Sequence, residues 1–211
     1  TKEGRTVLYV SHNMNTIRQL CERCIVLDQG KVVFDGDVEE GIDKYLGANI
    51  SFGSINEYSK EREKEYRLNG DLNISRTTLV DKEYPIYQAG EAIDLFIYYN
   101  SKHSFNDCAF RISVFSNKGD IIGMASTKPK VCCHIGDNRN HLRISAPNLA
   151  PGRYTFKLVA FRVNEYGSTE NLDVIDQAFS IEIVQREENN NVIWKSQYWG
   201  NIMFPEIAIE E

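Results

Sequence analysis

The chain has 211 residues, of which 42% are hydrophobic and 26% charged, and its formal net charge is −6. That apolar fraction is enough to build a core, so the composition excludes a disordered chain. The negative balance argues against a nucleic-acid partner, because Lys and Arg dominate binding to phosphates. No apolar run approaches the roughly 18 residues that a membrane-spanning helix needs. The sequence begins without an initiator Met or a hydrophobic signal region, so we expect a soluble piece excised from a longer protein.

Residues 1–47 have an α/β character. Residues 6–10 are almost wholly apolar, as in a buried parallel strand. A helix is predicted next, with an apolar face made of Ile17, Leu20, Cys21 and Cys24. Residues 25–27 and 32–34 are joined by a glycine-containing loop and predict a hairpin, and Asp37 is a good N-cap for a helix over 38–46. This segment is too short to close its own sheet.

Residues 48–69 differ from what precedes and follows them. They contain alternating charges over 60–65 and little apolar content. Such a composition predicts a solvated linker with some helix, and its functional alternative is a lever between domains or a docking surface.

From residue 70 to residue 188 the sequence consists of short runs of period two, separated by turn residues. The inward positions of these runs include Ile93, Leu95, Ile97, Tyr99, Phe110, Ile112, Tyr154, Phe156, Leu158, Phe179, Ile181 and Ile183. About seven such strands indicate an immunoglobulin-like antiparallel β-sandwich, so the whole chain is predicted to be mainly β. The run Leu149-x-Pro151-Gly152-x-Tyr154 resembles the entry to a tyrosine corner.

The five cysteines are predicted to be reduced thiols. Their number is odd and no secretion signal accompanies them. Cys21-x-x-Cys24 lacks a second pair of ligands at suitable spacing, so no structural zinc is expected. Cys132 and Cys133 should point to opposite faces of an extended segment.

Residues 6–13, followed by residues 24–36, resemble the end of an ABC-transporter ATPase domain. The resemblance makes His12 the switch histidine, which contacts the γ-phosphate of ATP and helps to orient the attacking water. The chain has no Gly-x4-Gly-Lys-Ser/Thr phosphate loop, no acidic strand end for Mg²⁺ and no Leu-Ser-Gly-Gly signature. We therefore expect no cofactor and no ATP hydrolysis in this chain, with ATP and Mg²⁺ bound by the intact parent protein.

An ABC ATPase end followed by a β-sandwich is similar to the Wzt-type ATPase subunits of bacterial polysaccharide exporters, which handle O-antigen, teichoic acid and related glycans. The matching residues are Gly90-Glu91, Phe110-x-Ile112 leading to Gly119, Leu149-x-Pro151-Gly152-x-Tyr154, Asp176-x-Ala178-Phe179 and Trp199. The resemblance implies a domain that recognises the exported polysaccharide, often its modified end, and can dimerise by exchanging terminal strands. It also implies a transmembrane permease as partner and a place at the cytoplasmic face of the plasma membrane.

Carbohydrate sites combine aromatic faces with planar hydrogen-bonding groups. Phe96 and Tyr98 are predicted to point away from the core, as are Arg111 and Phe161, with Arg162 at the end of its strand. We expect these side chains to form an aromatic and guanidinium platform on one sheet. The competing explanation is that outward aromatic residues are buried in a dimer interface or beneath a loop, in a sandwich that serves only dimerisation or regulation.

A second candidate site is the predicted loop over residues 128–140. It contains His134, Asn138 and Arg139, and His141 follows it. A carbohydrate-active enzyme would need two carboxylates at a controlled separation. Asp173 and Asp176 are available, but nothing around them in the sequence suggests acid–base chemistry.

The tail over residues 189–211 is rich in aromatic and apolar residues, and residues 192–199 are predicted to form a strand. Such an end is expected to pack on its own sandwich or to pair with the edge of a second chain.

Overall fold

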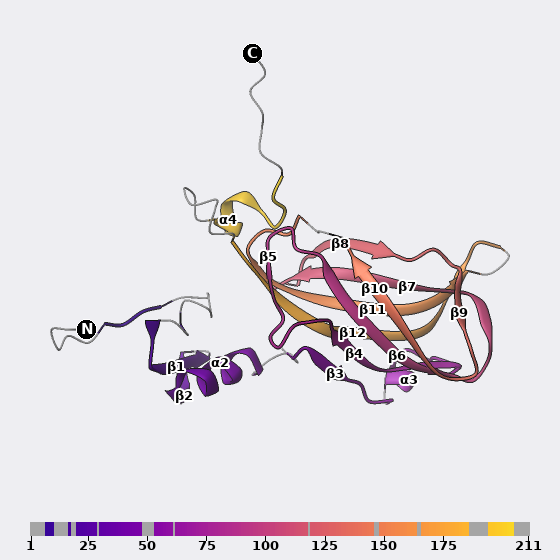
Figure 1. Ribbon diagram of the computed structural model, residues 1–211, viewed down its shortest axis with the longest axis horizontal. Helices are drawn as coiled ribbons and strands as arrows, with labels where there is room; N and C mark the ends of the chain where they lie inside the picture. Colours follow the sequence, from indigo (N-terminus) through magenta and orange to yellow (C-terminus); the bar gives the residue numbers. More distant parts are fainter. Residues whose placement is uncertain are drawn as a thin grey trace, which may run out of the picture. The chain divides into compact units, whose positions relative to one another are not determined.

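The computed structural model describes residues 7–10, 17, 20–28, 30–47, 53–60, 62–117, 119–145, 148–163, 166–185 and 194–204. The chain divides into two compact units, Thr1–Ser51 and Phe52–Glu211 (Figure 1). None of the helices in the described ranges is both long and apolar enough to cross a membrane.

The first unit contains a hairpin and a helix. Strands β1 (Arg23–Asp28) and β2 (Lys31–Asp37) pair antiparallel, and helix α2 (Val38–Gly47) follows directly. Val26, Val38 and Ile42 bury their side chains between hairpin and helix. The Oδ1 atom of Asp37 lies 3.4 Å from the amide nitrogen of Glu40, as an N-cap does. The predicted hairpin and second helix are therefore confirmed.

The predicted strand over residues 6–10 is wrong for its described part. Residues 7–10 have no regular structure, and Val10 is 95% exposed. A parallel strand exists only beside hydrogen-bonded neighbours, and in the described residues of this unit β1 and β2 pair only with each other. Ile17 accepts a hydrogen bond from the amide of Cys21, which confirms one turn of the first predicted helix. His12 lies outside the described residues.

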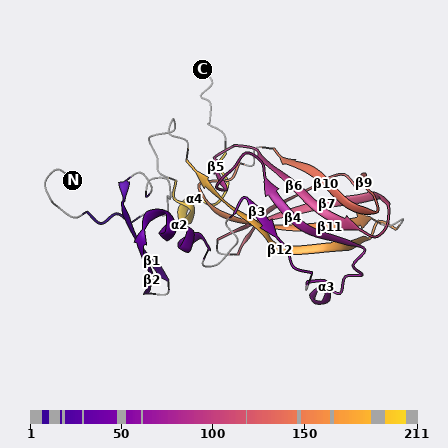
Figure 2. The same ribbon diagram turned by 60° about the horizontal axis from the view of Figure 1, so that its bottom comes forward.

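The second unit is a sandwich of two sheets (Figures 1 and 2). The four-stranded sheet is antiparallel and has the order β10 (Gly136–Ile144), β6 (Ile93–Ser101), β4 (Leu72–Leu79) and β3 (Ile55–Glu57). The six-stranded sheet has the order β5 (Ile86–Gln88), β12 (Thr169–Val184), β11 (Gly152–Val163), β7 (Phe105–Ser116) and β8 (Ile121–Ser126), and its sixth strand, β9 (Val131–Cys133), also pairs with β7. Only β5 and β12 pair parallel among the described strands. The mainly β sandwich predicted from the sequence is confirmed.

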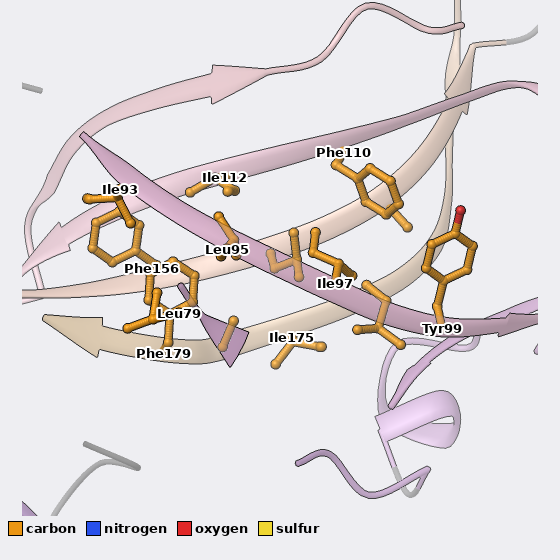
Figure 3. Close-up of a cluster of buried hydrophobic side chains, with 14 of the residues drawn as sticks. Leu79, Ile93, Leu95, Ile97, Tyr99, Phe110, Ile112, Phe156, Ile175 and Phe179 are labelled. Carbon is orange, nitrogen blue, oxygen red and sulfur yellow. The ribbon is translucent and has the colours of Figure 1, made fainter. Parts of the chain in front are cut away.

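The core lies between the two sheets. Along β6 the inward residues Ile93, Leu95, Ile97 and Tyr99 are at most 2% exposed (Figure 3). They face the six-stranded sheet, where Phe156 and Phe179 stack with their ring centroids 4.6 Å apart. The period-two prediction for these strands is therefore correct. Cys132 is exposed and Cys133 buried, as the alternation predicts.

The tyrosine corner is also confirmed. Tyr154 is 1% exposed, and its hydroxyl donates to the carbonyl of Ala150 at 2.8 Å. Burial raises the pKa of Tyr154 to about 12, so the hydroxyl stays a donor at neutral pH.

Replacing Tyr154 with phenylalanine is expected to lower the free energy of unfolding by about 1–1.5 kcal/mol, because the variant leaves the carbonyl of Ala150 without this donor. Urea unfolding followed by circular dichroism measures the change. Tyr198→Phe is the matched control, since Tyr198 is 72% exposed. Equal stability of the two variants would contradict a structural role for the corner.

The linker predicted over residues 48–69 is wrong in being solvated and separate from the sandwich, whereas the helix expected within it is confirmed. Residues 55–57 form β3, the edge strand of the four-stranded sheet, and α3 (Arg62–Glu65) follows. The hydroxyl of Tyr58 bonds to Thr77 and to the carbonyl of Ala178, so it joins both sheets. Figure 2 shows α3 beside the sandwich. Apolar residues spaced widely among charges, such as Tyr58, Tyr66 and Leu68, hold this segment in place.

The tail is helical where a strand was predicted. Residues 196–199 form α4 (Ser196–Trp199), and the indole of Trp194 packs edge-on against Trp199. Beyond α4, Ile202 pairs with Leu149 of the same chain. The expected packing of the tail on its own sandwich is confirmed for residues 201–203, and strand exchange with a second chain stays a prediction.

Candidate functional site

The strongest candidate site is the outer side of the four-stranded sheet. We call it the aromatic face and define it by the side chains of Asp94, Phe96 and Tyr98 on β6, Arg139, His141 and Arg143 on β10, and Arg76 on β4. Phe96 and Tyr98 alternate with the buried Leu95, Ile97 and Tyr99, so the pleat directs them away from the core.

Strand register arranges these residues in cross-strand rows. Arg139, Tyr98 and Arg76 form one row across β10, β6 and β4. His141 and Phe96 belong to the next row. The rings of Phe96 and Tyr98 are 6.4 Å apart and tilted by 53°. The register thus places an arginine on each side of Tyr98.

Both arginines stack on the aromatic rings. The guanidinium carbon of Arg76 lies 4.2 Å from the centroid of Tyr98, and that of Arg139 lies 4.7 Å from the centroid of Phe96. Attraction between a cation and the ring quadrupole favours this arrangement. The result is a surface of planar groups with hydrogen-bond donors at their rims.

One carboxylate organises the end of the aromatic face. Asp94 accepts a hydrogen bond from Arg143 at 2.8 Å, and the Nε2 atom of His141 lies 3.0 Å from its other oxygen. His141 also packs against Phe96, with ring centroids 4.9 Å apart. These contacts fix the orientation of Phe96, which is half-buried.

The prediction of a platform on one sheet is wrong. Phe96 and Tyr98 lie on the four-stranded sheet, whereas Arg111 and Phe161 lie on β7 and β11 of the other sheet. Phe161 is only 7% exposed, because Tyr66 and Leu68 pack against it. Outward positions on strands of unknown pairing cannot reveal which of them share a sheet. The alternative of burial beneath a loop therefore holds for Phe161.

Arg162 is held by other groups of the chain. Its Nε and Nη2 atoms donate to the two carboxylate oxygens of Asp107 at 2.9 and 2.8 Å, and its guanidinium stacks on Phe105. This hydrogen-bonded ion pair lowers the pKa of Asp107. Arg162 is thus placed at the far end of β11, away from the aromatic face.

Sequence reasoning placed Arg139 and His141 in or beside a loop and did not single out Arg76. The predicted loop over 128–140 is wrong, because residues 136–144 form β10. The inward residues of its first half are Asn138 and Asn140 instead of apolar residues, which hides the period of two. Asn140 accepts a hydrogen bond from the buried hydroxyl of Tyr99 at 2.6 Å. The sequence signal that could have revealed β10 is the run 137–143, in which ionisable residues alternate with asparagine or leucine.

Asp173 and Asp176 do not form a catalytic pair. Asp173 is fully buried and bound by Arg62, while Asp176 lies 2.5 Å from the amine of Lys157. Among the described residues no group of three or more His, Cys, Asp or Glu side chains could hold a metal ion.

The described residues of the first unit, a hairpin and a helix, do not by themselves fit ATP and Mg²⁺. They supply no glycine-rich phosphate loop and no cluster of carboxylates.

Comparison with known proteins identifies the sandwich. A family model described as the Wzt C-terminal domain matches residues 64–194. The chain belongs to the Wzt C-terminal domain family. A crystal structure of the C-terminal domain of Wzt superposes with a TM-score of 0.55 at 11% identity, over 68% of this chain and 86% of that one. The resemblance seen in the sequence is therefore confirmed, and the shared fold is that of the Wzt C-terminal domain.

The curated relatives are ATP-binding proteins of ABC transporters. One is a teichoic acids export ATP-binding protein, TagH, of Lactococcus lactis, with 49% identity over 73 residues, 35% of this chain and 16% of its own length. A TagH of Listeria innocua is 30% identical over 91 residues, 37% of this chain and 27% of its own length. An uncharacterized ABC transporter ATP-binding protein of Methanocaldococcus jannaschii is 33% identical over 97 residues, 44% of this chain and 15% of its own length. This Wzt-family chain thus spans well under a third of each of these relatives.

Proposed function

We propose that this chain is the glycan-recognition part of an ATPase subunit of a polysaccharide-export ABC transporter. The aromatic face binds the exported polysaccharide. The observation that carries the proposal is the row Arg139–Tyr98–Arg76 with Phe96 beside it, which joins aromatic rings to planar donors on the outer side of a sheet. Rings contact the C–H faces of sugars, and guanidinium and amide groups bond to their hydroxyls.

Membership in the Wzt C-terminal domain family and the teichoic-acid exporters among the relatives support this assignment. In the intact protein, ATP and Mg²⁺ act at a nucleotide domain to which His12 contributes the switch histidine. A transmembrane permease is the partner of that domain, at the cytoplasmic face of the plasma membrane, and the subunit works as a homodimer. Residues 1–211 contribute recognition rather than hydrolysis.

Replacing Tyr98 with alanine is expected to weaken glycan binding about tenfold or more, which corresponds to at least about 1.4 kcal/mol. A glycan array of neutral and acidic bacterial polysaccharides identifies a ligand, and isothermal titration then gives its dissociation constant. Phe96→Ala should have a similar effect, since the two rings are neighbours.

The matched control is Phe115→Ala, because Phe115 lies outward on β7 of the other sheet. The affinity of the Phe115→Ala variant for the glycan should equal that of the unsubstituted chain. If no glycan binds while the chain is folded, the sandwich serves dimerisation or regulation and the proposal is wrong. If Phe115→Ala weakens binding and Tyr98→Ala does not, the site lies on the other sheet.

A further inference from the structure

The aromatic face contains two guanidinium groups that have aromatic partners but, among the described residues, no hydrogen-bond acceptors. In the described part of the chain, neither Arg76 nor Arg139 donates a hydrogen bond to a carboxylate or carbonyl, and each lies against a ring instead. Arginine carries five N–H donors. Donors that have no acceptor in the protein form hydrogen bonds with water or with a ligand. Three other arginines of the sandwich already have carboxylate partners: Arg62 bonds to Asp173, Arg143 to Asp94 and Arg162 to Asp107.

The acidic groups near these arginines are mostly engaged elsewhere. Asp94 binds Arg143 and His141, and Asp137 accepts a hydrogen bond from Asn100 at 2.8 Å. Glu57 is the exception, because it lies opposite Arg76 in the register of β3 and β4 and is exposed. The row Arg139–Tyr98–Arg76 therefore carries two positive charges with one carboxylate at its β3 end.

Stacking prepares these guanidinium groups for an anion. A guanidinium held over a ring has one side against the aromatic face and still has N–H groups for an anion, which can bind two oxygens of a phosphate or carboxylate. Neighbouring strands are about 4.8 Å apart, so the backbones of Arg76 and Arg139 lie about 10 Å apart with Tyr98 between them. An oxyanion on a sugar that contacts Tyr98 is within reach of either fork.

We propose that the aromatic face selects glycans that carry an oxyanion, a phosphate or a carboxylate, and that Arg76 and Arg139 are the residues that select it. This inference rests on the proposed function and adds the chemical class of the ligand. The rings bind the sugar, and the two guanidinium forks bind the charged substituent. Neutral polysaccharides bind the same face more weakly, because their hydroxyls are weaker acceptors for the two forks than an ionised oxygen is.

The test compares three oligosaccharides of equal length, one neutral, one with a phosphodiester and one with a uronic acid, titrated against the chain of residues 1–211. The acidic ligands should bind about tenfold more tightly than the neutral one, and their advantage should shrink as NaCl is raised. In the double variant Arg76→Gln/Arg139→Gln, the acidic and neutral ligands should bind equally. Whether phosphate or carboxylate is preferred follows from the two acidic arms.

Arg111→Gln is the matched control. Arg111 also stacks on an aromatic ring, Phe161, but it belongs to the other sheet, so this variant should keep the preference for acidic ligands. Glu57→Gln removes the carboxylate opposite Arg76. This variant should bind the acidic oligosaccharides severalfold more tightly and the neutral one with unchanged affinity.

The two proposals fail in distinguishable ways. If neutral and acidic ligands bind equally well to the parent chain, and both depend on Tyr98, glycan recognition stands and the selection of anions is wrong. If inorganic phosphate alone binds as tightly as the phosphorylated oligosaccharide, the anion is held without the sugar, and the inference is overturned. If no oligosaccharide binds, the proposed function itself fails.

Discussion

Replacing Arg62 with alanine is expected to lower the free energy of unfolding of the sandwich by about 3 kcal/mol. Asp173 is fully buried, and Arg62 binds both of its carboxylate oxygens at 2.9 and 2.7 Å. Removing the guanidinium leaves a buried carboxylate without its counter-charge. The amides of Ile74 and Val174 also donate to Asp173, which keeps the cost near the lower end of the range for broken buried pairs.

The same guanidinium fastens the segment after β3 to the sandwich. Arg62 also donates to the carbonyls of Ser59 and Ile74, so one side chain connects α3, β4 and β12. Its loss should therefore release the segment over residues 58–68 as well as destabilise the core. Hydrogen exchange of the amides in this segment, which open at low free energy when their anchor is lost, measures that second effect.

Urea unfolding followed by circular dichroism measures the stability of Arg62→Ala against Lys60→Ala. Lys60 is exposed in the same segment, so its replacement should change stability by less than about 0.5 kcal/mol. If the two variants are equally stable, the ion pair with Asp173 contributes nothing, and the segment is held only by the apolar contacts of Tyr58, Tyr66 and Leu68.

Replacing Phe156 with alanine is expected to cost about 3–5 kcal/mol of unfolding free energy. Phe156 is fully buried on β11, and its ring lies nearly parallel to that of Phe179, with an interplanar angle of 11°. Truncation removes the transfer energy of the ring and leaves a cavity in the core cluster that also contains Ile93 and Leu79 (Figure 3). The surrounding structure closes such a cavity only in part, because the hydrogen-bonded ladders hold the strands of each sheet in place.

Phe204→Ala provides the control for this cavity. Phe204 is 85% exposed, so the same substitution there should leave stability within about 0.5 kcal/mol. Both variants are measured by urea unfolding at the same protein concentration. A cost below about 1 kcal/mol for Phe156→Ala would mean that the centre of the sandwich is more loosely packed than the burial of Phe156 indicates.

The position of residues 55–57 matters for the proposed function, because this part of the predicted linker borders the aromatic face. Residues 55–57 complete the four-stranded sheet, and Glu57 on β3 lies opposite Arg76 of the aromatic face. The strand that leads into the sandwich is thus also an edge of the candidate site. A freely solvated linker, as the charge pattern of residues 60–65 suggested, would have no such contact.

The strands β6, β7, β11 and β12 were predictable because each alternates apolar and polar residues over a long run. Their inward residues are the core, and the Pro151-Gly152-x-Tyr154 turn identified the corner between them. Alternation is a local property of one strand, so a single sequence reveals it.

The candidate site was only half predictable, because alternation within one strand does not reveal which strands lie beside it. Alternation showed that Phe96 and Tyr98 point outward, but not that Arg139 and Arg76 are their neighbours. β10 was hidden because its inward positions Asn138 and Asn140 are polar. Arg111 and Phe161 have the same local signature as Phe96 and Tyr98, and only the pairing of strands assigns them to another sheet.

By itself, then, the sequence determined the sandwich, its inward residues, the tyrosine corner and the resemblance to the Wzt family. The tertiary structure alone decided that Arg139, Tyr98 and Arg76 form one row and that Arg62 reaches Asp173, which is 111 residues away in the chain. The physical reason is that burial follows from the periodicity of one strand, whereas a site follows from the register between strands distant in sequence.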